Sequence, residues 1–348
     1  REPCKMTLGE WLDIWAGTYL GGVKPRTSKI YQDDIRLHIK PYLAAIRLDE
    51  LNTHTVQEFL NTLAARGKKI PKRDERGKIV KKDGKTVYDF VPLSPKTVKN
   101  VHGVLHGALR QAVINRYIPL NPADGDFCTL PKIEKQEINP LDEPQITAFL
   151  KAIQGNEYED IFIVTLFTGL REGEILGLTW DCVDFDHGTL RINKQMQLHQ
   201  EKGMKAYQLV PVKNSKNRTV TAAPFVMAQL RRHKVTQAEQ RLRAGALWEA
   251  SDLVFTNPFG RHLTKSTLYR AYKKVVASIG RPDARFHDLR HSYAVAAIRS
   301  GDDIKTVQGN LGHATAAFTL DTYGHVTNQM KQDSADRMEA FIRSVSGS

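Results

Sequence analysis

Two arginines, two histidines and one tyrosine stand in short motifs in the second half of the chain. The motifs read TGLREGE, HDLRHS, LGH and DTYGH, and they contribute Arg171, His287, Arg290, His313 and Tyr323. Arginine stays charged and holds two phosphate oxygens with its planar fork. Tyrosine is among the side chains that form covalent enzyme intermediates. The set suits attack of a phenol oxygen on a phosphodiester, with preorganised donors balancing the charge that develops.

The order and spacing of these four motifs resemble those of the tyrosine recombinase (integrase) family, most of all the integrases of conjugative transposons and temperate phages. The resemblance covers roughly residues 5–345. It implies that Arg171 is the family's first arginine and that Glu174 supports it. It likewise assigns His287 and Arg290 to the family's His-x-x-Arg pair. His313 is then the later histidine, and Tyr323 the nucleophile.

The family also uses a lysine as the general acid toward the leaving 5′-oxygen. Lys213 ends the strand-like run VPVK, which suits that role. Lys216 follows closely, in a segment that reads more simply as a solvated turn. We expect Lys213 to be the general acid, with Lys216 as the alternative.

The resemblance implies a site-specific DNA recombinase that integrates or excises a mobile element. Such an enzyme cleaves double-stranded DNA through a 3′-phosphotyrosyl intermediate, needs no cofactor, and works as a homotetramer on paired sites, in some cases with accessory DNA-bending factors. Two other functions remain open at this point: a type IB topoisomerase-like enzyme, and a non-catalytic DNA-binding regulator on the same scaffold. A filled set of catalytic positions weighs against the regulator.

The resemblance implies a DNA-binding protein of the bacterial cytoplasm, associated with the nucleoid, whereas composition alone does not distinguish DNA from RNA or an anionic membrane. The 348 residues include 51 Lys and Arg against 38 Asp and Glu, a net charge of +13 that points to a polyanion as partner. No apolar run is long enough for a membrane span. The three cysteines form no Cys-x-x-Cys pair, and the histidines His287, His291, His313 and His325 lack the companions of a metal site, so we expect no metal.

The pattern of apolar residues predicts a mainly α protein with a small antiparallel β-sheet. We expect a helical core-DNA-binding domain over residues 1–122, a proline-containing linker over 123–140 and a catalytic domain over 141–348. In the first domain, Thr55 with Glu58 predicts a capping box that opens a helix ending at Gly67. In the second, the predicted strands are 189–192, 207–212 and 218–221.

A basic hairpin is predicted to interrupt the first domain near residues 68–92. Asp83-Gly84 separates two short β-prone runs, 78–80 and 86–88. Residues 68–85 hold nine basic and three acidic side chains. Such a segment is either a solvated loop or a finger along a phosphate backbone, and the rest of the chain favours the finger. The expected DNA contacts are Lys68, Lys69, Lys72, Arg73, Lys78, Lys81, Lys82 and Lys85.

A helix with one apolar face is predicted over residues 327–345, directly after the tyrosine motif. Its apolar stripe consists of Met330, Met338, Phe341, Ile342 and Val345. This face either packs on its own domain or docks into a neighbouring protomer. The family resemblance favours docking.

Overall fold

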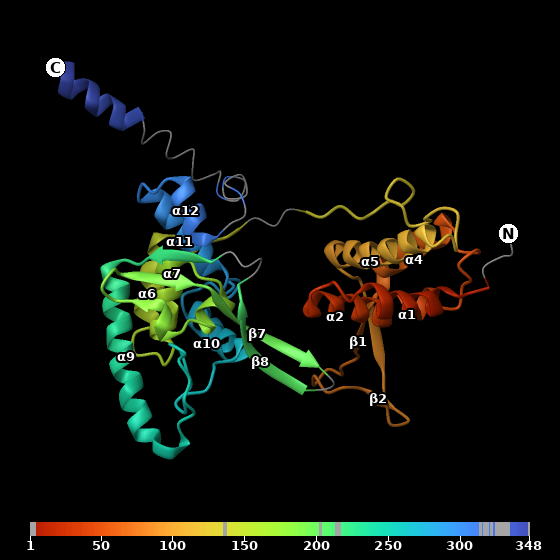
Figure 1. The fold of residues 1–348 in the computed structure, drawn as a ribbon, viewed down its shortest axis with the longest axis horizontal. Coiled ribbons are helices and arrows are strands. Elements are labelled where there is room, and N and C mark those ends of the chain that lie inside the picture. Colours follow the sequence, from red (N-terminus) through yellow and green to blue (C-terminus); the bar gives the residue numbers. More distant parts are fainter. Residues whose placement is uncertain are drawn as a thin grey trace. The chain divides into compact units, whose positions relative to one another are not determined.

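The computed structural model describes residues 5–134, 138–201, 204–212, 217–312, 315, 320, 323 and 335–346. The chain forms two compact units, residues 1–136 and 137–348 (Figure 1). Each unit has its own hydrophobic core. The predicted fold class, mainly helical with small antiparallel ladders, is confirmed. Within the described ranges, no helix has the length and apolar character needed to cross a membrane.

Unit 1 is a bundle of helices, and two tryptophans of its first helix pack into the core. Its elements are α1 (Leu8–Tyr19), α2 (Pro25–Asp34), the π-helical turn η1 (Ile35–Ile39), α3 (Lys40–Leu43), α4 (Thr53–Arg66) and α5 (Pro95–Ile114). Trp11 is fully buried, and its indole Nε1 donates a hydrogen bond of 2.9 Å to the Ala108 carbonyl of α5. Trp15 lies one turn further along α1 and is also buried. These contacts fix α1 against the longest helix of the unit.

Helix α4 begins two residues before the predicted start. The Asn52 side chain accepts from the Thr55 backbone N–H at 3.0 Å, so Asn52 is the N-cap and Thr55 already lies in the first turn. The predicted capping box of Thr55 and Glu58 is therefore wrong: asparagine caps a helix as well as threonine does, and here it stands earlier. The predicted end at Gly67 is confirmed.

Between α4 and α5 the chain leaves the bundle as a narrow arm, residues 68–91, which we call the basic hairpin. Strand β1 (Lys68–Pro71) pairs with β4 (Tyr88–Val91), and β2 (Lys81–Lys82) pairs with β3 (Lys85–Thr86). Asp83 and Gly84 both have positive φ, 51° and 73°, the two-residue turn that the sequence predicted. The predicted hairpin on this turn is present: Lys81 pairs with Thr86, and next to that pair the Val87 N–H donates to the Val80 carbonyl at 3.0 Å.

Unit 2 is built mainly of helices around a small antiparallel sheet. Its helices are α6 (Glu143–Ala152), α7 (Glu159–Thr168), α8 (Glu172–Leu176), α9 (Pro224–Ala244), α10 (Lys265–Ser278), α11 (Asp288–Arg299) and α12 (Ile304–Leu311), with the short turns η2 (Trp180–Cys182) and η4 (Gly245–Leu247). The sheet has the order β5 (Val183–Asp184), β6 (Thr189–Ile192) and β9 (Arg218–Thr221). Residues 335–346 form a further helix.

The strand predicted over 207–212 does not join that sheet. It is part of β8 (Met204–Pro211), which pairs along its whole length with β7 (Lys194–Glu201) in a separate hairpin. The expectation of one sheet made of 189–192, 207–212 and 218–221 is wrong in this respect. Strand β7 reads KQMQLHQE, and its polar composition gave no run of apolar residues to predict a partner for β8.

Two cores hold unit 2 together. The larger one includes the aromatic side chains Phe149, Phe162, Tyr272 and Phe286, whose ring centroids lie 5.5–6.3 Å apart in edge or tilted contacts. The smaller one lies between α11 and α12 and is made of Ala294, Val295, Ile298, Val307, Leu311 and Tyr323. Tyr323 thus belongs to the packing that joins these two helices.

Candidate active site

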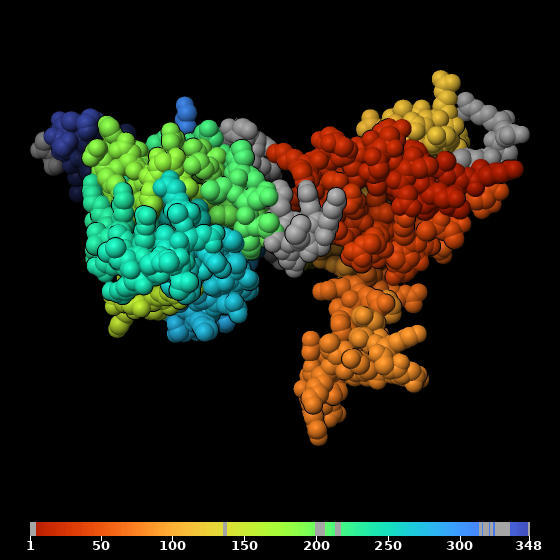
Figure 2. All heavy atoms as spheres, turned by 60° about the horizontal axis from the view of Figure 1, so that its bottom comes forward, coloured from red at the N-terminus to blue at the C-terminus, as the bar shows by residue number. Residues whose placement is uncertain are grey.

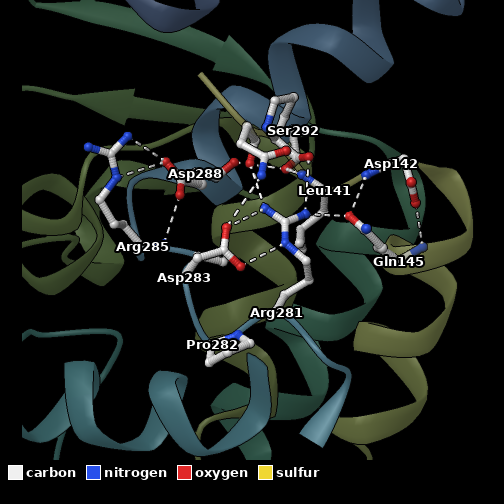
Figure 3. A network of polar contacts seen from close by, with 12 residues as sticks. Leu141, Asp142, Gln145, Arg281, Pro282, Asp283, Arg285, Asp288 and Ser292 are labelled. Carbon is white, nitrogen blue, oxygen red and sulfur yellow. Dashed lines mark hydrogen bonds and ion pairs between the residues drawn. The ribbon is translucent and has the colours of Figure 1, made fainter. Parts of the chain in front are cut away.

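Helix α11 is anchored at its first turn by a network of polar contacts (Figure 3). The Arg281 guanidinium, almost completely buried, donates to the Asn139 carbonyl at 2.9 Å and pairs with Asp283 at 3.1 Å. The Ser292 hydroxyl accepts from the Leu141 N–H and donates to the Asp288 carbonyl, both at 2.8 Å. Ser292 thus ties α11 to residue 141, and Arg281 ties the loop before α11 to residue 139, so the residues on the first turns of α11 have fixed positions.

A left-handed turn at Gly169 brings Arg171 to the site. Gly169 has φ 64° and ends α7, and a Cβ added there would lie 2.5 Å from the Tyr293 ring. Only glycine suits this combination of backbone conformation and close packing. Two residues later Arg171 caps α8, and its backbone N–H and Nη1 both donate to the Glu174 carboxylate, at 2.9 and 2.8 Å. The predicted support of Arg171 by Glu174 is present in the structure.

Glu174 has a second and more buried partner, which the sequence reading missed. Arg218 on β9 donates from Nη1 and Nη2 to the two carboxylate oxygens at 3.0 and 2.7 Å, a bidentate pair. Burial alone would raise the pKa of Glu174, but the hydrogen bonds and charges of Arg218 and Arg171 lower it to about 2. A signal for Arg218 was available: it lies two residues before the buried Val220, on the same face of the strand.

Arg171, Arg218 and Arg290, which we call the arginine cluster, converge on the end of α12. Arg218 Nε donates to the Asn310 carbonyl at 2.7 Å, and Arg171 Nη2 donates to the Gly312 carbonyl at 3.1 Å. Arg290 Nη2 donates to the Leu311 carbonyl at 2.6 Å. The last carbonyls of a helix carry partial negative charge, so this end of α12 attracts cations.

Arg290 is the most buried member of the cluster, with 1% of its surface exposed. Its Nη1 donates to the Gly169 carbonyl at 2.7 Å, which links the turn after α7 to α11. Burial and the neighbouring Arg171 lower the pKa of Arg290 to about 9, which leaves the guanidinium charged at neutral pH. A guanidinium carries five N–H donors, so Arg290 keeps donors beyond these two bonds for an anion.

The two histidines of the HDLRHS motif lie edge to face, with ring centroids 4.9 Å apart. His287 is at the N-cap position of α11 and is exposed to solvent. Partial burial of its ring and the charges of Arg290 and Arg171 lower the pKa of His287 to about 4. Burial and His287 lower the pKa of His291 to a similar value. Both rings are therefore neutral at pH 7 and able to accept one proton each.

Tyr323 is fully buried, and its hydroxyl lies 2.8 Å from Nδ1 of His291. Burial raises the pKa of Tyr323 to about 12, against the opposing charge of Arg290. The phenol is thus protonated at neutral pH and lies within the electrostatic reach of an arginine. A contact between the tyrosine and His291 was not predicted from the sequence.

The structure brings together Arg171, Glu174, His287, Arg290 and Tyr323 from three segments of unit 2. His313, Lys213 and Lys216 lie outside the described residues. The basic residues predicted to contact DNA all lie on the basic hairpin of unit 1 and are exposed. Figure 2 shows the hairpin, in orange, projecting from the rest of unit 1.

The charges of this site favour an anionic ligand. Three guanidinium groups face one carboxylate, Glu174, and the two neutral histidines add no negative charge. The surplus positive charge is suited to a phosphate group, whose oxygens accept charge-assisted hydrogen bonds from arginine. A tyrosine beside such a phosphate can act as a nucleophile.

Comparisons with known proteins identify both units. The family model described as the phage integrase family matches residues 139–330, more than half of the chain. The model of the phage integrase N-terminal SAM-like domain matches residues 7–64. A protein named tyrosine recombinase XerC-like, from Caldanaerobacter subterraneus subsp. tengcongensis, is 28% identical over 97% of this chain and 84% of its own length. An integrase of Saccharopolyspora erythraea is 23% identical over 97% of this chain and 82% of its own.

Solved structures share the fold. The Tn1549 transposon integrase in complex with a circular intermediate DNA has a TM-score of 0.72 at 20% identity, covering 96% of this chain and 99% of its own. The XerH site-specific recombinase bound to its difH substrate has a TM-score of 0.58 at 20% identity, covering 93% and 82%.

Arg218 is expected to be essential for the stability of unit 2. Arg218→Leu removes the bidentate partner of a carboxylate that is 3% exposed, and breaking a buried pair costs about 3–5 kcal/mol. Arg191→Leu, on the neighbouring strand β6, is the matched control, because its contact with Asp181 is 3.8 Å long and exposed and should contribute only about 0–1 kcal/mol. Urea unfolding of both variants measures the difference. Equal losses would contradict the role of Arg218.

Proposed function

This chain belongs to the phage integrase family, whose members are tyrosine recombinases, and we propose that the site around Arg290 and Tyr323 carries out its DNA strand exchange. The protein is a site-specific DNA recombinase, an enzyme that acts on double-stranded DNA. Its relatives do not favour the topoisomerase-like or the regulatory alternative. The single observation that most supports the assignment of the site is that Tyr323 is buried between α11 and α12, where it interacts electrostatically with Arg290.

In the proposed reaction, Arg171 and Arg290 hold the two non-bridging oxygens of the scissile phosphate. An anionic oxygen makes stronger hydrogen bonds than the neutral carbonyls of Gly312 and Leu311, and arginine donors remain available for it. His287 is exposed beside both arginines, and its neutral ring can hydrogen-bond the phosphate or accept a proton. His313 directly follows Gly312 in the sequence, and it would be a further donor to the same phosphate.

The covalent step is then a transesterification. The phenol oxygen of Tyr323 forms a bond to phosphorus, and the bond from phosphorus to the 5′-oxygen breaks, so the phosphate remains linked to the 3′ end. The phenol proton passes to a base, and Lys213 supplies a proton to the leaving 5′-oxygen. Attack by a 5′-hydroxyl from a partner strand reverses the step and joins the two duplexes without an external energy source. Integration or excision of a mobile element results.

Strand exchange between paired sites requires several protomers, and we propose a homotetramer that forms on DNA. On the helix 335–346 the four described members of the predicted apolar stripe are exposed, from 48% for Ile342 to 65% for Val345. Met330 lies outside the described residues. An exposed apolar stripe is expected to be covered in an assembly, and docking on a neighbouring protomer would cover it. Accessory DNA-bending factors and a location at the nucleoid are parts of the same proposal.

The basic hairpin is proposed to bind the phosphate backbone. Its lysines and Arg73 are exposed, and the ion pairs described for the chain include none of them. Tyr88 and Phe90 are exposed on β4, and Lys69 lies 4.2 Å from the Tyr88 ring centre. An arm of this charge can follow a DNA groove or backbone without reading the sequence.

The covalent step is tested with a nicked DNA duplex that contains the DNA sequence flanking the gene for this protein. When the strand is cleaved near the nick, its short end diffuses away from the duplex. We call this substrate the suicide duplex. Wild-type protein should accumulate a covalent adduct that resists denaturation. Tyr323→Phe should bind the duplex and form no adduct, because it lacks the nucleophilic oxygen. A normal adduct yield in that variant would contradict the assignment of Tyr323 as the nucleophile.

The same assay distinguishes the two lysines. Lys213→Ala should cleave poorly, and cleavage should recover when sulfur replaces the bridging 5′-oxygen, since a thiolate leaves without a proton. Lys216→Ala is the matched control and should cleave both substrates normally. Recovery confined to Lys216→Ala would show that Lys216 is the general acid.

The role of the basic hairpin is tested by the salt dependence of DNA binding. Neutralising Lys81 and Lys82 to Gln should reduce the slope of log affinity against log salt by up to about 2, since each phosphate contact contributes about 0.9. Lys151 and Lys274, on α6 and α10, are also exposed and provide a control with the same change of net charge. If both pairs change the slope equally, the hairpin has no special contact with DNA.

The apolar stripe is tested by replacing Met338 and Phe341 with Ser. The variant should bind a single site normally but form fewer four-protomer complexes on paired sites, as sedimentation measures. Replacing Arg337 and Glu339 with Ser on the same helix is the control and leaves the apolar face intact. The docking proposal fails if the first variant assembles like the control.

A further inference from the structure

His291 follows Arg290 on α11, and the family motifs assign it no role in this chain. Its Nδ1 lies 2.8 Å from the Tyr323 hydroxyl oxygen, and the two ring centroids are 5.9 Å apart. We propose that His291 is a positioning residue, which holds the phenol oxygen of Tyr323 in line for attack beside Arg290. The inference rests on the proposed function, because it matters only if Tyr323 is the nucleophile.

Apolar packing places the Tyr323 ring but gives its phenol oxygen no polar partner. The Tyr323 ring is buried among Ala294, Val295, Leu311 and other apolar side chains of α11 and α12, and these contacts are not directional. A hydrogen bond is directional, and it weakens steeply when donor and acceptor are misaligned. In the described structure His291 supplies the hydrogen bond to the phenol, and so fixes where its oxygen points.

The helix couples this bond to the phosphate site. Arg290 is held by the carbonyls of Gly169 and Leu311, at 2.7 and 2.6 Å. His291 is the next residue of the same helix, so the nucleophile and the arginine that binds the phosphate share one rigid support. Fixing reacting atoms in this way accelerates a reaction strongly, and a misplacement of about 1 Å can cost roughly 100-fold.

In the DNA-free protein, the contact between His291 and the Tyr323 hydroxyl does not transfer a proton. The pKa of His291 is lowered to about 4 by burial and by its neighbour His287, and burial raises the pKa of Tyr323 to about 12. Over so wide a gap the proton stays on the phenol. The bond therefore joins two neutral groups, and its contribution is orientation.

Three variants test the proposal on the suicide duplex. His291→Phe keeps a ring of similar size and loses the nitrogen. His291→Asn keeps a polar atom near the position of Nδ1. Tyr293→Phe, two residues further along α11, is the matched control, because it keeps the ring that packs on the same core and removes only a comparable hydrogen bond of 3.0 Å, from Asn310. Each variant is measured for DNA affinity, melting temperature and the single-turnover rate of adduct formation.

We expect His291→Phe to bind DNA like the wild type and to form the adduct about 10–100-fold more slowly. His291→Asn should recover most of the rate, and Tyr293→Phe should match the wild type. A wild-type rate in His291→Phe would overturn the proposal. An equal loss of rate in Tyr293→Phe would also overturn it, because the loss would then come from a general disturbance of α11. If the wild-type protein forms no adduct, the proposed function and this inference fall together.

Discussion

The chemistry of unit 2 depends on holding three guanidinium groups, those of Arg171, Arg218 and Arg290, close together in a partly buried region. Like charges at such distances repel, and burial strengthens the repulsion because the local dielectric is low. Two features balance it. The Glu174 carboxylate, 3% exposed, lies between Arg171 and Arg218, and the last carbonyls of α12 accept hydrogen bonds from all three arginines.

This balance has a functional consequence. Because Glu174 and the end of α12 hold the arginines in place before any ligand arrives, an incoming phosphate meets donors that are already oriented. The same contacts join the turn after α7, the strand β9, and the helices α11 and α12 around a single point. Tyr323 packs between α11 and α12, so the group that attacks and the groups that bind the phosphate are fixed by one set of contacts.

Much of the site could be predicted because it depends on residue type and local spacing. The glycines at 169 and 312 both have positive φ, so each short motif forms its turn from its own sequence. Arg290 follows His287 by three residues, which places both on the first turn of α11. The Asp-Gly turn of the basic hairpin was predictable for the same reason. At the start of α4, Asn52 rather than Thr55 is the N-cap, and the residue types alone do not rank the two, because both cap helices well.

The sequence by itself thus determined the family, the fold class and the motifs that carry the chemistry, because those are properties of residues close together in the chain. Tertiary structure alone decided which distant residues meet. Arg218 lies 44 residues from Glu174, and His291 lies 32 residues from Tyr323. The pairing of β8 with β7 could not be predicted either, because β7 is mostly polar. Hydrogen bonds across such separations leave no periodic trace in a single sequence, since they arise only when packing brings the two side chains together.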